Sequence, residues 1–129
     1  MNALVSLSLV EFDVLQRVAL QFTDISSRFL ESINATDEDV ERIWSLLDSA
    51  GAADGAVQAF QLDVSADEGQ LARIHVEAQS VRICVTRREH SLICQLGTRA
   101  QSGFGDPELY YRTGYRMPQI RDVFKKICG

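Results

Sequence analysis

Apolar residues recur at helical spacing through the first quarter of the chain. They follow the i, i+3 and i+4 pattern that places side chains on one face of a helix: Phe12, Leu15, Val18, Ala19, Phe22, Ile25, Phe29 and Ile33. Ahead of them, Ser8 and Glu11 have the spacing of a capping box, in which each side chain accepts a backbone N–H group. We therefore expect a helix over residues 9–33, bent near Thr23 and Asp24.

A second interpretation concerns the residues before this helix. Val5, Leu7 and Leu9 alternate with serines, and such a period of two is typical of a strand. The sequence leaves open whether residues 4–10 form a strand or lead into the helix.

A second helix is predicted after Asn34 and Ala35 interrupt the first pattern. Thr36 suits the N-cap position, and the three acidic residues that follow it suit the positive end of a helix dipole. The buried stripe would contain Val40, Ile43, Trp44 and Leu47, and the helix would end near Ala50 and Gly51. The short link predicts an antiparallel helical hairpin, and we interpret the acidic cluster as a helix start.

The middle of the chain changes to a period of two. The alternating apolar residues fall in three groups, which are Phe60, Leu62 and Val64, then Ile74, Val76 and Ala78, then Val81, Ile83 and Val85. We interpret the change of phase at Ser80 as a bulge in one long strand. With a last strand over residues 91–96, these segments predict an antiparallel meander of three strands, or of four if residues 3–10 join it.

The last hairpin of this meander has a predicted register. With Arg88 and Glu89 at its tip, the apolar pairs are Val85 with Leu92, Ile83 with Cys94, and Val81 with Leu96. Cys84 and Cys94 would then lie on opposite faces and could not form a disulfide. The face without those pairs would be wet or covered by a partner, and it would carry Arg73, His75, Glu77, Arg82 and Gln95 with Cys84 and Ile93.

Residues 98–117 show no clear period and contain every tyrosine of the chain. Long irregular segments are uncommon in compact domains and are often functional, and Tyr and Arg are enriched in binding hot spots. The candidate binding residues are therefore Arg99, Phe104, Tyr110, Tyr111, Arg112, Tyr115 and Arg116. In a competing interpretation the tyrosines form a lid on the sheet, anchored by Leu109, with the arginines in water.

The chain ends in a third predicted helix. Pro118 suits the first position, and Ile120, Val123, Phe124 and Ile127 form an apolar stripe. We expect this helix to pack on one face of the sheet. The predicted fold is a single α+β domain over residues 1–129.

Composition and charge narrow the class of protein. The 129 residues are 46% hydrophobic and 24% charged, as in an ordinary globular domain. Residues 1–80 hold 14 acidic and four basic residues, a balance of −10, whereas residues 81–129 hold nine basic and four acidic residues, a balance of +5. The overall charge of −5 argues against broad nucleic-acid binding. The basic part could still meet an acidic partner.

The sequence also predicts a location. No apolar run approaches the roughly 18 residues that a membrane span needs, and no basic residue precedes the apolar residues at the N-terminus. Three cysteines, an odd number without framework spacing, favour a reducing compartment. We expect a cytoplasmic protein without membrane contact, with Cys128 partly exposed and reduced.

Candidate chemistry is sparse. His75, Glu77 and Cys84 share one face of the predicted sheet and could supply a base, its orienting group and a nucleophile. An exposed histidine beside a glutamate on a wet sheet is the simpler interpretation, and His90 is expected in a turn. No His/Cys pair has ligand spacing, so we predict no metal or cofactor and favour a protein that is not an enzyme.

Two functions remain as hypotheses. The first is a non-enzymatic protein-binding module of the secretion-chaperone, toxin-neutralising or regulatory-subunit type. Val10, Val14 and Leu20 widen the apolar face of the first helix, which favours a homodimer or a protein partner. The alternative is a small-ligand-binding protein or enzyme, in which Arg99, Arg112 and Arg116 would hold a small anionic group between the sheet and residues 98–117.

Overall fold

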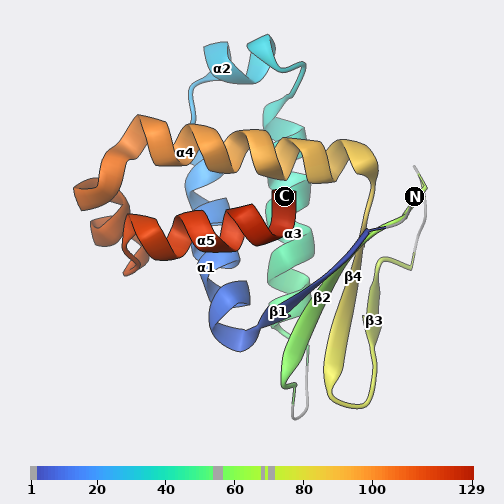
Figure 1. Cartoon of the computed structure of the whole chain (residues 1–129). Coiled ribbons are helices and arrows are strands. Elements are labelled where there is room, and N and C mark those ends of the chain that lie inside the picture. The colour runs from blue at the N-terminus through green and yellow to red at the C-terminus, as the bar shows by residue number, and fades with distance from the viewer. Residues whose placement is uncertain (1–2, 54–56, 68, 70–71) are drawn as a thin grey trace.

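Helices and one sheet build the protein, as predicted for an α+β domain (Figure 1). The computed structural model describes residues 3–53, 57–67, 69 and 72–129. The helices within these ranges are α1 (Leu9–Leu20), a 3₁₀ helix η1 (Gln21–Asp24), α2 (Ser27–Ser32), α3 (Asp37–Gly51), α4 (Arg87–Thr113) and α5 (Met117–Cys128). The strands are β1 (Ala3–Ser8), β2 (Ala59–Val64), β3 (Ile74–Val76) and β4 (Ser80–Val85).

The first strand and the first helix meet at Ser8. Its side chain accepts a hydrogen bond from the backbone N–H of Glu11 at 3.1 Å, and the Glu11 carboxylate accepts one from the Ser8 N–H at 2.8 Å. The capping box is therefore confirmed, and the strand interpretation of the residues before it holds up to Ser8. One helix over residues 9–33 is wrong, because α1 ends at Leu20 and Ser26 caps a separate helix α2.

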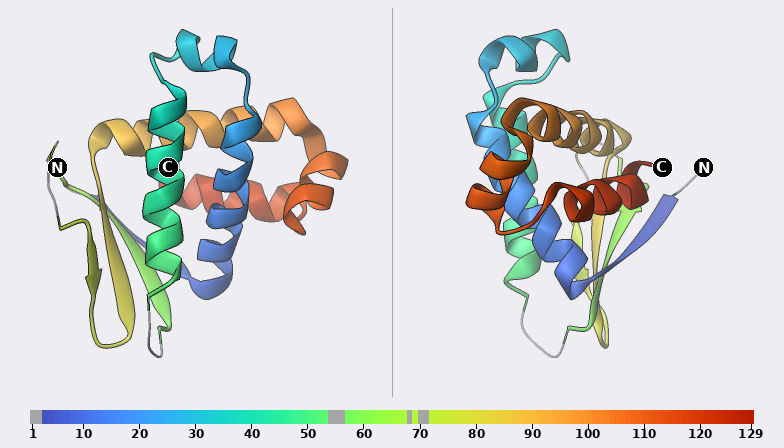
Figure 2. Two further views of the ribbon diagram at one scale, coloured as in Figure 1. Left: turned by 180° about the vertical axis from the view of Figure 1, so that it is seen from behind. Right: turned by 60° about the vertical axis from the view of Figure 1, so that its left-hand side comes forward.

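Helices α1 and α3 lie side by side and run in opposite directions (Figure 2). The N-cap Thr36 and the acidic first turn of α3 are confirmed. The link between the two helices is longer than predicted because it contains η1 and α2. Asn34 completes the link in the left-handed region, with φ of 58°.

The sheet is mixed and has the strand order β1-β2-β4-β3. β1 pairs with β2 and β3 pairs with β4 in antiparallel fashion, whereas β2 and β4 are parallel. The all-antiparallel meander is therefore wrong. The change of phase at Ser80 is the turn of the β3–β4 hairpin, where the Glu77 N–H donates to the Ser80 carbonyl at 2.8 Å, and it is no bulge.

Residues 91–96 belong to helix α4, so the predicted last strand and its hairpin register are wrong. Thr86 caps α4, and Glu89 completes a capping box with it. The tip and the three apolar pairs expected there do not exist. Cys84 is not bonded to Cys94, as predicted, although the register behind that prediction was wrong.

Residues 98–117 are largely helical, which contradicts the prediction of an irregular segment. Gly105, with φ of 78°, interrupts α4 but does not end it. Gly114 ends the helix with φ of 82° and donates its N–H to the carbonyl of Tyr110 at 2.8 Å. Only a residue that tolerates positive φ suits these two positions.

Helix α5 begins at Met117, one residue before the predicted first position at Pro118, and has the predicted buried stripe. It was expected to pack on one face of the sheet, but it packs on α1 and α4 instead. α4 and α5 run antiparallel and cross over α1 and α3 (Figures 1 and 2). α1 therefore contacts other elements on several sides, and Val14 is completely buried inside the protein, whereas Val10 and Leu20 are about half exposed.

The two faces of the sheet differ in character. The inner face packs on the helices, and the ring of Phe60 stacks on that of Phe12 with centroids 3.8 Å apart. The outer face is polar, as predicted, and Arg82 pairs there with Asp63 and Glu77 at 3.2 Å each. Among the helices described, none is both long enough and apolar enough to cross a membrane.

Candidate functional site: a groove along helix α4

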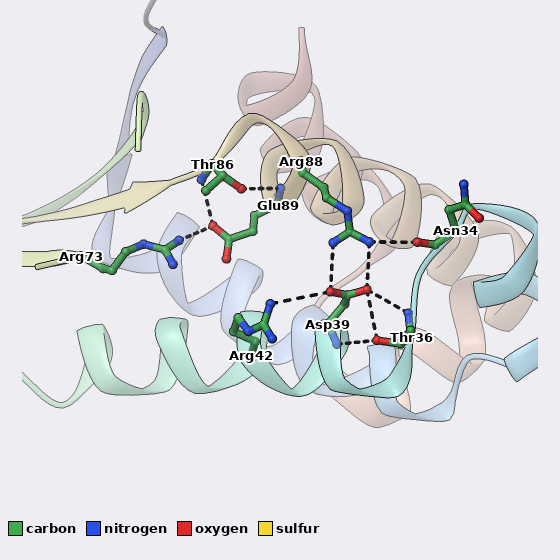
Figure 3. A network of polar contacts seen from close by, with 8 residues as sticks. All are labelled: Asn34, Thr36, Asp39, Arg42, Arg73, Thr86, Arg88 and Glu89. Atoms are coloured by element: carbon green, nitrogen blue, oxygen red, sulfur yellow. Dashed lines mark hydrogen bonds and ion pairs between the residues drawn. The ribbon is translucent and has the colours of Figure 1, made fainter. Parts of the chain in front are cut away.

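A network of charged side chains fixes the N-terminal end of α4 (Figure 3). Glu89 is buried and accepts the Thr86 N–H at 2.8 Å as part of the capping box. The same carboxylate accepts a hydrogen bond from Arg73, the residue directly before β3. Arg73 also donates to the carbonyl of Cys84 in β4 at 2.8 Å. The start of α4 is thereby joined to the sheet.

A second part of the network joins α4 to α3. Arg88 donates from both terminal nitrogens to the two oxygens of Asp39, at 2.9 and 3.0 Å, and also to the carbonyl of Asn34 (Figure 3). Asp39 accepts the N–H of Thr36 as well. Hydrogen bonds from Arg88 and then from Thr36 lower the pKa of Asp39 to about 2 despite its burial. These charges are mutually satisfied, which indicates a structural role.

Further along α4, a groove separates this helix from α2. It has a volume of about 460 Å³ and is lined by Phe29 of α2, by Ile33 directly after α2, and by Cys94, Gln95, Thr98, Arg99 and Ser102 of α4. A smaller hollow of about 190 Å³ continues it, lined by Asp24, Ile25, Ser26, Arg99, Gly103 and Phe104. Arg99 is common to both hollows. We call the two together the α2–α4 groove.

Arg99 has an unusual environment among the charged groups of α4. Its guanidinium lies 5.3 Å from the centre of the Phe29 ring, within the range of a cation–π interaction. Within the described part of the chain, no carboxylate forms an ion pair with it. The groove therefore combines an apolar floor with one positive charge that is available to a ligand.

Two other predicted residues, Phe104 in the lining of the smaller hollow and Arg112 beside it, contact each other. The Arg112 guanidinium lies 4.5 Å from the centre of the Phe104 ring and donates to Glu108 at 2.7 Å and to Asp24 at 2.6 Å. The hydrogen bond to Glu108 has the largest effect and the one to Asp24 the next largest, and both raise the pKa of Arg112. Arg112 thus ties the later part of α4 to η1.

The remaining predicted residues do not reach the groove. Arg116 lies 3.8 Å from the centre of the Tyr110 ring and 3.6 Å from Asp106. The Tyr115 hydroxyl donates to Asp13 on α1, which raises the pKa of Tyr115. Tyr111 is 86% exposed. The lid interpretation is also wrong, because Leu109 is buried but its segment is the end of a helix that packs on α1 and α5.

The outer face of the sheet does not assemble a catalytic group. Burial raises the pKa of the Cys84 thiol, so the thiolate is disfavoured. Glu77 pairs with Arg82, and no hydrogen bond among the described residues joins His75 to Glu77 or Cys84. Catalysis by these three residues stays unsupported.

A cluster that the sequence interpretation overlooked lies where α4 meets the end of α5. Cys94 and Cys128 are bonded to each other, so the expectation that Cys128 is reduced is wrong for this structure. Nε2 of His90 lies 3.8 Å from the sulfur of Cys94 and 2.9 Å from the carbonyl oxygen of Ile127. His90 was expected in a turn, but it lies in the first turns of helix α4.

Arg99 and Phe104, two of the candidates named from the sequence, line the groove, whereas its α2 side was not anticipated. The overlooked signal was Thr86-Arg87-Arg88-Glu89, which has the same capping spacing as the box at Ser8. With a helix starting there, residues 90, 94 and 98 fall on one face at i, i+4 spacing. Nothing local in the sequence places α2 against that face, because the contact is tertiary.

Comparison with known proteins adds no functional information. No protein-family model, no curated protein and no solved structure matches the chain, and the function is therefore argued from this geometry alone.

Proposed function

We propose that the protein is a non-enzymatic protein-binding module that receives a segment of its partner in the α2–α4 groove. The observation that carries this proposal is Arg99, a cation without a carboxylate partner among the described residues, placed over Phe29 in a groove with an apolar floor. Interfaces are typically centred on aromatic and arginine side chains in such surroundings. The fitting segment presents an apolar side chain beside a carboxylate.

The groove supports this proposal better than the outer face of α1 does. Val10 and Leu20 are exposed on α1, but the ion pair between Asp13 and Arg17 lies between them in the sequence, and its two atoms are 2.9 Å apart. Val14, the third residue that suggested a homodimer, is completely buried. The apolar width of α1 is thus partly explained by contacts within the chain.

The alternative of a small anionic ligand rests on fewer groups than the sequence suggested. Arg112 and Arg116 face carboxylates within the chain, which leaves Arg99 as the remaining member of the proposed anion-holding set. One guanidinium at an open groove offers a small anion little beyond a single screened ion pair.

Charge reversal in the groove tests the proposal. Immobilised wild-type protein, Arg99→Glu and Arg87→Glu are exposed to extract of the native host, and retained proteins are quantified by mass spectrometry. Arg87 is the matched control, since it is an exposed arginine on α4 outside the groove lining. We expect a protein that is retained by wild type and Arg87→Glu and lost with Arg99→Glu.

Two further results would contradict this function. Equal retention by all three forms would show that the groove is not the interface. A stabilising thermal shift with small anions, lost in Arg99→Glu, would favour the small-ligand alternative. Sedimentation of the purified proteins shows whether the partner is a second copy of this chain or a different protein. A homodimer formed through the groove would sediment as a dimer in wild type and as a monomer in Arg99→Glu.

A further inference from the structure

Three side chains with metal-binding atoms converge at the junction of α4 and α5. His90 and Cys94 stand four residues apart on α4, and Cys128 is the last residue of α5. One ligand atom from each lies within 4.8 Å of the others. His90 and Cys94 are partly exposed and Cys128 is exposed, so an ion from solvent can reach all three.

The helices hold this arrangement independently of the sulfur–sulfur bond. α4 and α5 run antiparallel, which brings the start of α4 to the end of α5 (Figure 1). Their contact is close, because a methyl group at Gly97 would stand only 2.3 Å from the Phe124 ring. Ile127, next to Cys128, is buried in the core. Reduction of the disulfide would therefore leave the two thiols as neighbours.

The ligand set selects a soft metal ion. Thiolate and imidazole groups suit Zn²⁺, whereas Mg²⁺ and Ca²⁺ prefer oxygen ligands, and the cluster contains no carboxylate. Zinc bonds of about 2.3 Å to sulfur and about 2.0 Å to nitrogen need ligand atoms less than about 4 Å apart. The separation of 3.8 Å between Sγ of Cys94 and Nε2 of His90 meets that requirement for this pair, and the three ligand atoms together lie within 4.8 Å of one another.

His90 needs one change to become a ligand. A carbonyl oxygen only accepts hydrogen bonds, so Nε2 carries the proton in its contact with Ile127. A shift of that proton to Nδ1 frees the lone pair of Nε2 beside Cys94. The carbonyl of Ile127 lies in the last turn of α5 and can then bond to water.

We propose that the reduced protein binds Zn²⁺ through Nε2 of His90 and the sulfurs of Cys94 and Cys128, and that the Cys94–Cys128 disulfide is the oxidised form of the same site. A cellular dithiol supplies two electrons and two protons that break the disulfide and itself becomes a disulfide. Zn²⁺ then displaces the two thiol protons. Three protein ligands leave one tetrahedral position for water or an external group.

Metal titration of the reduced full-length chain tests the site. The protein is reduced, freed of reductant without oxygen, and titrated with Co²⁺ as a coloured substitute for Zn²⁺, then with Zn²⁺ against a chromophoric chelator. We expect one metal ion per chain, thiolate-to-cobalt absorption, and displacement of Co²⁺ by Zn²⁺. The disulfide form should bind no metal, because both sulfurs are occupied.

Four variants make the result specific. Cys94→Ser, Cys128→Ser and His90→Gln should each weaken Zn²⁺ binding by more than about tenfold, the lower end of what even outer partners of a metal site contribute. Cys84→Ser is the matched control, since this cysteine is buried in the sheet away from the cluster and should leave affinity unchanged. The proposal is overturned if the reduced wild type takes up no metal, or if Cys128→Ser or His90→Gln binds it as tightly as wild type.

Discussion

The charged side chains at the start of α4 and those in its groove-lining part differ in their partners. At its start, Glu89 pairs with Arg73, which directly precedes β3, and Arg88 pairs with Asp39 of α3 (Figure 3). About three turns further on, Arg99 meets the face of Phe29 and has no ion-pair partner among the described residues. Both parts are rich in arginine, and the groove places its arginine, Arg99, against an aromatic ring without a carboxylate partner among the described residues.

This difference teaches where to look for function when comparison with known proteins gives no match. A buried charge that is fully paired stabilises the fold only when both partners are present, so removing one is costly. An exposed cation over an aromatic ring contributes little to stability, and its removal is tolerated. The start of α4 should therefore respond to mutation through stability, and the groove through binding.

The largest effect is expected at Glu89. Glu89→Ala removes the acceptor of the Thr86 N–H and leaves Arg73 without its carboxylate, which should lower the free energy of unfolding by about 3 kcal/mol. Urea denaturation measures this change. Glu38→Ala, an exposed position in the first turn of α3, is the control and should change stability by less than about 0.5 kcal/mol. Equal effects at both positions would remove the distinction between the two parts of α4.

Acid should weaken the same network. Because the pKa of Asp39 is lowered from 3.8 to about 2, its contribution is fully present above pH 4 and is lost as the pH falls toward 2. The shift corresponds to about 2 kcal/mol. Urea denaturation at pH 5 and near pH 2 measures the loss, and Asp39→Asn should show a smaller loss than wild type. An unchanged pH dependence in Asp39→Asn would contradict the assignment.

Two glycines of α4 differ in the space around them, because Gly97 is packed against α5 whereas Gly103 has room for a side chain. Gly97→Ala places a methyl group 2.3 Å from the buried ring of Phe124 and should destabilise the protein by at least about 1 kcal/mol. Gly103→Ala meets only the Arg99 side chain at 3.7 Å and should raise stability by up to about 1 kcal/mol through helix propensity. Thermal unfolding of both variants gives the signs, and a stabilising Gly97→Ala would show that the α4–α5 contact is loose.

The smallest effect on stability is expected in the groove. Arg99→Ala removes one cation–π contact and should change the free energy of unfolding by less than about 0.5 kcal/mol while it abolishes partner retention. Denaturation and the retention assay are run on the same preparation. A loss above about 2 kcal/mol would place Arg99 with the structural charges instead.

Periodicity and capping boxes were sufficient for the elements whose signals are local. Ser8, Thr36 and Pro118 mark the starts of α1, α3 and α5, and the outer face of the sheet is polar as expected. The error began at Thr86, where alternating apolar residues after the helix start resembled a strand. Leu92, Ile93 and Leu96 are equally compatible with a helix buried on more than one side.

The order of the strands and the groove could not be read from local patterns. β2 and β4 pair in parallel although β3 lies between them in the sequence, and this pairing depends on long-range contacts. In the same way, Phe29 and Arg99 meet only because α2 folds back over α4. The candidate residues on α4 could be named from their types, but their neighbours on α2 could not.

The position of β4 between β2 and β3 has a consequence for how the protein folds. β3 and β4 are joined by three residues, so their hairpin closes a short loop and can form early. The parallel edge of β4 must then dock on β2, a step that depends on contacts distant in the sequence. We expect that docking to limit the rate of folding and the hairpin to survive as the last local structure when the sheet comes apart.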